Sequence, residues 1–296
     1  MVQVQHPDKR GTIFVEQAKV LDHIAYPAQQ YRMILHAPRC AETARPANFV
    51  HLRCSEALAM RRPYSIMSVS RQQGRIELLY KVVGKGGEAL SQKQVGNEVN
   101  LMGPIGNCFT PHPQRPELLL LGGGVGIPPI FFLAQQIKQD NTYKPLVMVA
   151  SEVPFPFELK LSQLQVSEIS PDCHLALAEL EALGIASRLA SGRKKQGCFN
   201  GYIDAFARIY LKKISPQRLA HTEIFACGPE AMLKSVTKLS AEFGVPCQLA
   251  VEEYMACGVG GCAGCTIAVR QNGKTEMKRV CVDGPVFNAN QLVGFV

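Results

Sequence analysis

The sequence lacks several features that would place it in other classes of protein. A membrane-spanning helix needs about 20 apolar residues, and the most apolar run, Leu118–Ala134, is shorter and interrupted by glycines and prolines. The first residues, Met1–Thr12, are polar and have no apolar core of a secretory signal. No basic patch is interleaved with aromatic residues, and no segment repeats. We therefore expect a cytoplasmic protein with no nucleic acid partner and no membrane attachment.

The net charge says little about the partners or cofactors of the protein. The formal net charge is +8, and the basic residues are spread along the chain instead of forming a tail. Such a surplus only weakly favours an acidic partner or anionic cofactors. The length of 296 residues suits two domains, with room for a small third.

Cysteine, by contrast, is plentiful. The chain has 11, an odd number, and without a secretion signal a disulfide framework is not expected. Seven of the cysteines stand alone, and the simplest interpretation makes each a small, buried or half-buried apolar side chain. These seven are Cys40, Cys54, Cys108, Cys173, Cys198, Cys227 and Cys247.

The pattern of expected secondary structure changes twice along the chain. The first third has short strand-like runs separated by turn residues, which predicts a barrel or sandwich: Thr12–Val20, Gln30–His36, Phe49–Cys54 and Arg75–Val83. The middle third alternates strands with helices, which predicts a mostly parallel sheet. Its expected strands are Glu117–Leu121, Pro145–Ala150, Cys173–Ala178 and Glu223–Cys227, and its expected helices are Ile127–Gln139, Phe157–Gln165 and Glu230–Phe243. Beyond Pro246, an Asn272-Gly273 turn between two strand-like runs predicts a hairpin.

The four remaining cysteines form a pattern. Cys257, Cys262 and Cys265 give C-x4-C-x2-C, and Cys281 lies one hairpin later, which is the plant-type spacing for a [2Fe–2S] cluster. Glycines within the loop let its backbone wrap closely and direct amides at sulfur. Zinc is the main alternative, but zinc sites usually present two C-x2-C pairs, and here there is one. Free thiols are the third interpretation.

A second motif is Arg62-Pro63-Tyr64-Ser65. It resembles the Arg-x-Tyr-Ser signature of ferredoxin-reductase-like flavin barrels, although alone it also suits an ordinary strand end. The resemblance implies that Arg62 pairs with the FAD pyrophosphate, that Tyr64 stacks on the isoalloxazine ring and that Ser65 bonds near N5. It extends to Leu79-Tyr80-Lys81, to the glycine turn with Gly86 and Gly87, and to Gly103-Pro104-Ile105-Gly106-Asn107-Cys108-Phe109.

Two further turns indicate a nucleotide site. A buried strand runs into Gly122, Gly123, Gly124 and Gly126 before a helix, and such a turn is a natural anion site, although a weak signal alone. Cys227-Gly228-Pro229 also follows a buried strand and, in ferredoxin-reductase-like proteins, borders the nicotinamide. Cys227 is therefore our candidate catalytic residue, with a core cysteine as the alternative. The basic residues Arg188 and 193–195 either meet a 2′-phosphate of NADP(H) or form a solvated loop.

Taken in order, these pieces resemble one family, the electron-transfer subunits of type B dihydroorotate dehydrogenases. The most diagnostic stretches are Glu252–Cys265 and Cys281–Phe287. The resemblance implies an oxidoreductase of pyrimidine (UMP) biosynthesis. A separate catalytic subunit oxidises dihydroorotate on its FMN, and electrons then cross the [2Fe–2S] cluster to FAD and reach NAD⁺, in a heterotetramer of two catalytic and two electron-transfer subunits. Gly86-Gly87 departs from the Gly-Thr common in that family.

The motifs together predict a multi-domain chain of α+β and α/β class. We expect an N-terminal antiparallel β-barrel for FAD at 1–112, a central parallel α/β domain for NAD(P) at 113–245 and a small cysteine-rich [2Fe–2S] domain at 246–296. One alternative function is an NAD(P)H-dependent ferredoxin or sulfide/polysulfide oxidoreductase subunit. The other is not an enzyme but a zinc-bearing regulatory protein on a flavin-reductase fold.

Overall fold

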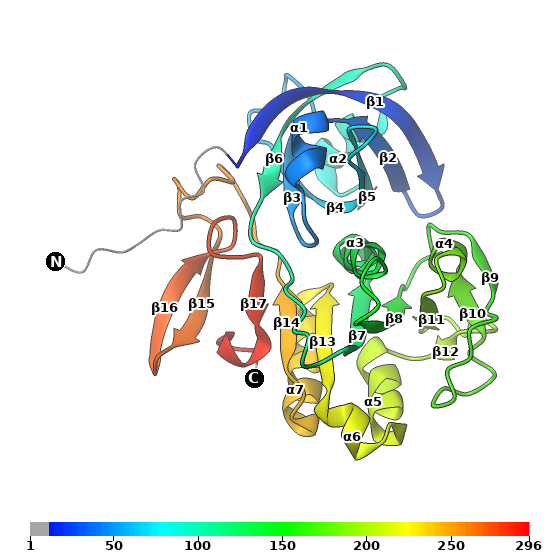
Figure 1. Cartoon of the computed structure of the whole chain (residues 1–296). Coiled ribbons are helices and arrows are strands. Elements are labelled where there is room, and N and C mark those ends of the chain that lie inside the picture. Colours follow the sequence, from blue (N-terminus) through cyan, green and yellow to red (C-terminus); the bar gives the residue numbers. More distant parts are fainter. Residues whose placement is uncertain (1–11, 296) are drawn as a thin grey trace.

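The computed structural model describes residues 12–295, and a closed antiparallel barrel forms its first part (Figure 1). Six strands follow one another around the barrel in the order β1-β2-β5-β4-β3-β6. Their side chains alternate, so that on one strand Val50 and Leu52 fill the barrel while Phe49 faces the neighbouring sheet domain. The strands are β1 Phe14–Tyr26, β2 Gln30–His36, β3 Phe49–Arg53, β4 Arg62–Ser70, β5 Arg75–Lys81 and β6 Glu98–Ile105, with helices α1 Pro38–Thr43 and α2 Gly84–Ser91 in the connections.

A seven-stranded sheet forms the second part, in the order β12-β11-β8-β7-β13-β14-β17. All neighbours pair in parallel except β14 and β17. Strand β7 is apolar and buried from Leu118 to Leu121, as a sheet covered on both faces requires. The strands are β7 Glu117–Gly123, β8 Lys144–Ala150, β11 Ala186–Ser191, β12 Phe199–Asn200, β13 Thr222–Cys227, β14 Cys247–Ala250 and β17 Val286–Asn288.

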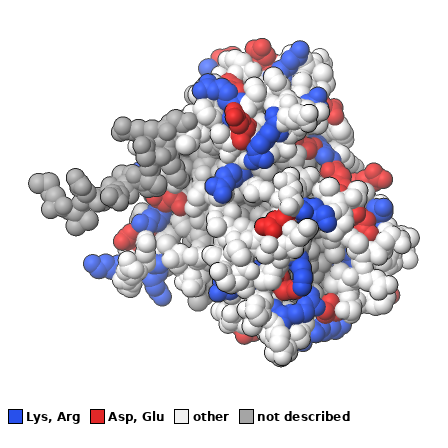
Figure 2. Space-filling model, in the orientation of Figure 1, with Lys and Arg blue, Asp and Glu red and all other residues white. Residues whose placement is uncertain are grey.

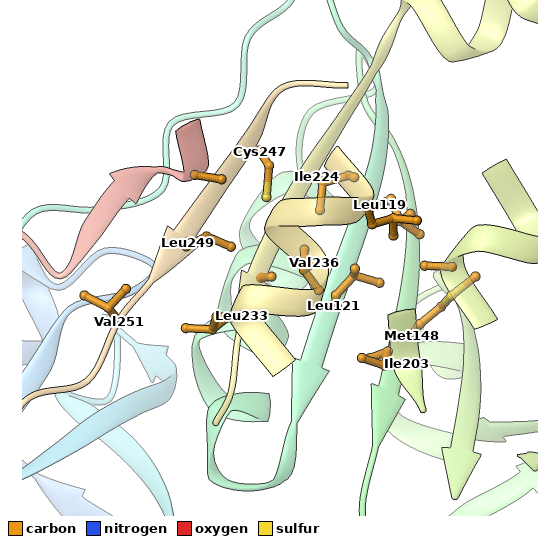
Figure 3. Packing of buried hydrophobic residues seen from close by; sticks show 14 of the residues in the cluster. Leu119, Leu121, Met148, Ile203, Ile224, Leu233, Val236, Cys247, Leu249 and Val251 are labelled. Carbon is orange, nitrogen blue, oxygen red and sulfur yellow. The ribbon is translucent and has the colours of Figure 1, made fainter. Parts of the chain in front are cut away.

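Helices cover both faces of this sheet. They are α3 Ile127–Ile137, α4 Ala178–Ala182, α5 Ile203–Lys213, α6 Pro216–Ala220 and α7 Glu230–Phe243, with the short 3₁₀ turns η1 Gly124–Gly126 and η2 Ala289–Gln291. Leu233 and Val236 of α7 pack on Leu121, Ile224 and Leu249 of the strands (Figure 3). No helix within residues 12–295 is long and apolar enough to cross a membrane.

The third part is small and lies beside the first two. Its hairpin joins β15 Thr266–Gln271 to β16 Lys274–Arg279, and Asn272 and Gly273 both have positive φ, as the Asn-Gly signal predicts. The barrel, the α/β domain and the cysteine-bearing segment confirm the expected fold class. The division at 112/113 and 245/246 stays a proposal. Strands β14 and β17, which lie beyond residue 245, pair into the central sheet.

One expected element has the wrong type, and another belongs to a different sheet. Residues 157–165 are not helical, because Phe157, Leu159 and Leu161 alternate with period two and form the strand β9 Leu159–Leu161. Strand β10 Leu175–Leu177 falls inside the expected strand at 173–178, yet it pairs antiparallel with β9 and not with the parallel sheet. The sheet position goes instead to β11, which the sequence did not predict.

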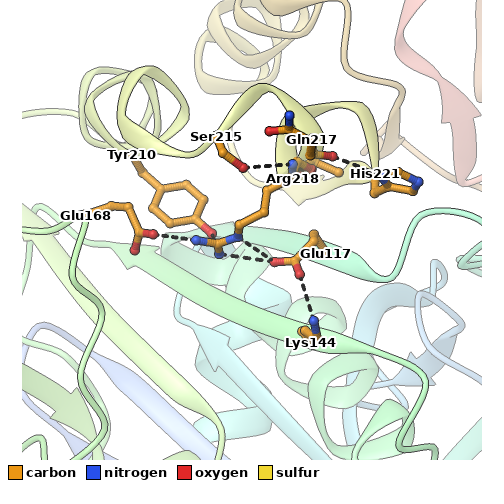
Figure 4. Close-up of polar contacts among 9 residues, drawn as sticks. Glu117, Lys144, Glu168, Tyr210, Ser215, Gln217, Arg218 and His221 are labelled. Carbon is orange, nitrogen blue, oxygen red and sulfur yellow. Dashed lines mark hydrogen bonds and ion pairs between the residues drawn. The ribbon is translucent and has the colours of Figure 1, made fainter.

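A polar cluster lies at the end of the sheet where β7 and β8 begin (Figure 4). Arg218 contacts Glu117, Glu168 and the hydroxyl of Tyr210, and Lys144 also pairs with Glu117 at 3.2 Å. A cleft of about 640 Å³ opens here, but its central cation is already paired. We therefore assign this cluster to the stability of the fold.

Candidate functional site

A cleft of about 770 Å³ lies where the three parts meet. The barrel, the turn after β7, the end of β13 and the segment before the cysteine loop all contribute to its wall. Nine of the predicted residues line it: Arg62, Pro63, Tyr64, Ser65, Leu79, Tyr80, Lys81, Gly87 and Cys227. The flavin motif and Cys227, which lie far apart in the sequence, thus face one space.

Aromatic rings form one side of this cleft. Tyr64 and Tyr80 contact each other edge to face at 5.4 Å between ring centroids. The Tyr80 hydroxyl lies 2.8 Å from His23 Nε2, and burial raises the pKa of both tyrosines above the usual range. The rings therefore stay neutral and offer flat apolar faces to a planar ligand.

One end of the cleft is built from Arg62 and α2. A Cβ atom on Gly86 would lie 2.8 Å from Arg62 Cγ, so only a glycine lets the helix start pack against that side chain. No side chain caps the N-terminus of α2 within the described residues. A guanidinium beside a helix start fits the pyrophosphate of FAD.

The nucleotide turn lies behind the cleft. A Cβ on Gly126 would lie 2.4 Å from the backbone of Cys227 and Gly228, so the two predicted motifs touch through their main chains. Gly122, Gly123, Gly126 and Gly228 are buried and do not line the cleft, and neither do Gly86, Gly124 and Pro229. Val125 and Pro129 line it instead.

Cys227 is a neutral thiol. Its side chain is 2% exposed, and burial, followed by the nearby Glu252 carboxylate, raises its pKa well above the usual value. A thiol held protonated packs against a ligand and does not attack it. Glu252 also lines the cleft; its only signal in the sequence is that it opens the diagnostic stretch 252–265.

The four predicted cluster cysteines fall into two pairs. The sulfur atoms of Cys265 and Cys281 lie 3.3 Å apart and are buried. Cys257 and Cys262 form the other pair, at the more exposed end of the loop. Two pairs of thiols suit two irons.

Backbone amides already point at these sulfur atoms. The amides of Val259 and Cys262 lie 3.5 and 3.4 Å from Cys257 Sγ, and the amide of Gly264 lies 3.4 Å from Cys262 Sγ. Burial opposes ionisation of Cys257, yet the amide hydrogen bonds lower its pKa to about 6. Burial, with the Cys265 thiol, raises the pKa of Cys281 to about 12. A loop that stabilises a thiolate fits a negatively charged cluster.

The fold and these sites define a flavin-dependent oxidoreductase with an iron–sulfur domain. The model of the oxidoreductase FAD-binding domain matches residues 22–109, and that of the iron-sulfur cluster binding domain of dihydroorotate dehydrogenase B matches residues 252–293. FAD and an iron–sulfur cluster are therefore its cofactors, as the sequence predicts.

Similar whole chains agree with this class. The electron transfer subunit of dihydroorotate dehydrogenase B (NAD(+)) from Desulforamulus reducens is 34% identical over 94% of this chain and 98% of that protein. Its counterpart from Geobacillus thermodenitrificans is 30% identical, with the same two coverages. The chain belongs to the family of dihydroorotate dehydrogenase B electron transfer subunits.

Solved structures share the fold. An NADH-dependent reduced ferredoxin-NADP oxidoreductase superposes with a TM-score of 0.75 at 23% identity, over 94% of this chain and 90% of that one. The ferredoxin reductase of carbazole 1,9a-dioxygenase gives 0.61 at 20% identity, over 79% and 67%.

Proposed function

We propose that this chain carries electrons between a dihydroorotate-oxidising catalytic subunit and NAD⁺, in pyrimidine (UMP) biosynthesis. The observation that carries the proposal is the shared cleft. Its wall combines the flavin motif, Cys227, and Met255, Ala256 and Gly264 from the segment that holds the cluster cysteines. One cleft therefore reaches both the nucleotide side and the cluster side.

Each predicted residue has a role in this proposal. Arg62 and the first turn of α2, with Gly86 and Gly87, hold the FAD pyrophosphate. Tyr64 and Tyr80 flank the isoalloxazine ring, Ser65 bonds near N5, and Pro63, Leu79 and Lys81 complete the wall. When bound, FAD exchanges electrons singly with the cluster and in pairs with a nicotinamide. Cys257, Cys262, Cys265 and Cys281 hold the [2Fe–2S] cluster at the loop.

The nicotinamide nucleotide occupies the turns at Gly122–Gly126 and Cys227–Pro229. The neutral Cys227 thiol packs against the nicotinamide and excludes water beside the flavin. Buried Arg188 supports NAD⁺ over NADP⁺, because its guanidinium donates to Ser162 Oγ at 2.9 Å, Ser187 O at 2.7 Å and Leu164 O at 2.6 Å. It is therefore not available to a 2′-phosphate.

The name of the family implies a catalytic partner subunit. We propose that this partner carries FMN and that two copies of each subunit form a heterotetramer. None of the 11 cysteines, all of them among the described residues, forms a disulfide, which supports the reducing cytoplasm as the compartment of this chain.

The substitution Cys257→Ser tests the function. It should remove the cluster and stop dihydroorotate-driven NAD⁺ reduction in the reconstituted complex, while NADH oxidation by an artificial acceptor stays within about two-fold, because the flavin cleft is intact. Iron content, flavin content and both activities are measured on the same preparation.

Cys198→Ser is the matched control, since Cys198 is a half-buried thiol outside the cluster loop. It should leave both activities and two irons per chain unchanged. If Cys257→Ser lowered both activities equally while FAD stayed bound, the proposed order of carriers would be wrong. A wild-type protein isolated with zinc and no iron would refute the cluster itself.

A further inference from the structure

His51 is a buried histidine whose ring has no visible partner. It lies on β3, its side chain is 0% exposed, and neither Nδ1 nor Nε2 makes a hydrogen bond to any described residue. Leaving a buried polar group unsatisfied costs about 1–3 kcal/mol, so native structures rarely tolerate one without a reason. The barrel core does not explain it, because Val50 and Leu52 on either side point into the barrel while His51 points out.

The ring lies against the cluster loop. A Cβ built on Gly258, the residue after Cys257, would lie 2.7 Å from His51 Nδ1. Gly258 has φ +70°, so this position combines a left-handed backbone with close approach of the ring, and both conditions favour glycine. The ring thus touches the loop one residue beyond a proposed ligand.

The surroundings keep the ring neutral. Arg61 Nη1 donates to the carbonyl oxygen of His51 at 3.1 Å, and burial, then Arg61 and Arg62, lower the pKa of His51 to about 4. A neutral imidazole carries one N–H donor and one acceptor. The barrel therefore presents a single N–H group to the loop that wraps the cluster.

We propose that His51 donates a hydrogen bond from the flavin barrel to a sulfur atom at the Cys257 side of the cluster. This inference rests on the proposed function insofar as it requires the cluster to be bound. A hydrogen bond to sulfur stabilises the more negative, reduced cluster and so raises its reduction potential. His51 also fixes the loop against the same strand that lines the flavin cleft through Phe49.

The test compares His51→Phe with His51→Asn in the full chain. Phenylalanine fills the space without a donor, whereas the asparagine amide occupies the position of Nδ1. At a fixed applied potential, His51→Phe should lower the ratio of reduced to oxidised cluster about ten-fold, or about 59 mV for one electron. His51→Asn should recover most of the loss. Arg53→Gln, an outward-facing change two residues along β3, should leave the ratio unchanged.

A spectroscopic measurement on the wild-type protein tests the proposal even where a variant fails to fold. In wild-type protein with ¹⁵N-labelled histidine, pulsed EPR of the reduced cluster should show coupling to a histidine nitrogen, and this coupling should vanish in His51→Asn. A wild-type cluster without any histidine coupling overturns the proposal, as do equal potentials in His51→Phe and wild type. Both results leave the proposed function standing, whereas a wild-type protein without a cluster overturns the proposed function.

Discussion

The barrel contacts its two neighbours in different ways. On the cluster side, Asn107 Nδ2 donates to the carbonyls of Asp283 and Val286 at 3.1 and 3.0 Å, and its Oδ1 accepts from the Val286 amide at 2.8 Å. On the far side of α3, Arg32 of β2 pairs with Glu179 of α4, and Gln30 donates to Pro154 O at 2.8 Å. The first contact consists of hydrogen bonds from one amide side chain to backbone, whereas the second combines an Arg32–Glu179 ion pair with a single hydrogen bond from Gln30 to backbone.

The difference matches what each neighbour does. Electron tunnelling falls steeply with distance, so a cluster must stay at one distance from a flavin. A nucleotide must enter and leave, and an edge held by charged side chains opens at little cost. Lys and Arg are interspersed with Asp and Glu over the face in Figure 2. We infer that the contact of the barrel with residues 283–286, the cluster side, is rigid. The contact of β2 with α4 and Pro154, the nucleotide edge, opens more easily.

Gly106→Ala should have the largest effect of the substitutions that test this difference between the two contacts. Gly106 has φ +92°, and a Cβ there would lie 2.4 Å from Pro285 Cδ, four residues after Cys281. We expect a loss of about 3 kcal/mol in the free energy of unfolding, from backbone strain and overpacking together. Urea denaturation measures it, and iron content should fall as the cluster segment loosens. Gly192→Ala, where no atom lies within 4 Å, is the control. Equal stability of the two variants would show that this side is not rigid.

The second prediction concerns Asn107→Ala. The change removes three hydrogen bonds between the barrel and residues 283–286, each worth about 1 kcal/mol, so we expect a loss of about 2–3 kcal/mol. Hydrogen exchange of the Val286 amide should also rise. Asn97→Ala removes one hydrogen bond within a barrel turn, to the Gln94 amide, and should cost about 1 kcal/mol without changing exchange at Val286. Unaltered exchange at Val286 in Asn107→Ala would contradict a rigid contact between the barrel and residues 283–286.

The motifs can be read from the sequence because each is local. C-x4-C-x2-C, Arg62–Ser65 and Cys227–Pro229 each fall within a few positions, and at least one residue of each motif lines the same cleft: Arg62–Ser65, Cys227 and Gly264. His51 and Asn107 carried no such signal, because their contacts with Gly258 and Val286 cross about 200 and 180 positions. Strand β11 was missed since Ser187 and Arg188 break its apolar pattern while both are buried. The sequence therefore did not predict contacts between residues that lie far apart in the chain.

The smallest expected effect is that of Glu179→Gln at the nucleotide edge. Glu179 is 36% exposed, so losing its pair with Arg32 should cost only about 0.5 kcal/mol, and the cost should disappear in about 1 M salt, where the Debye length is about 3 Å. Native-state hydrogen exchange should rise in α4 and stay unchanged at residues 283–286. Glu56→Gln, which breaks the exposed Arg53–Glu56 pair within the barrel, should alter neither region. If Glu179→Gln raised hydrogen exchange at residues 283–286 as much as in α4, the two contacts would open together. The nucleotide edge could then not move independently of the cluster side.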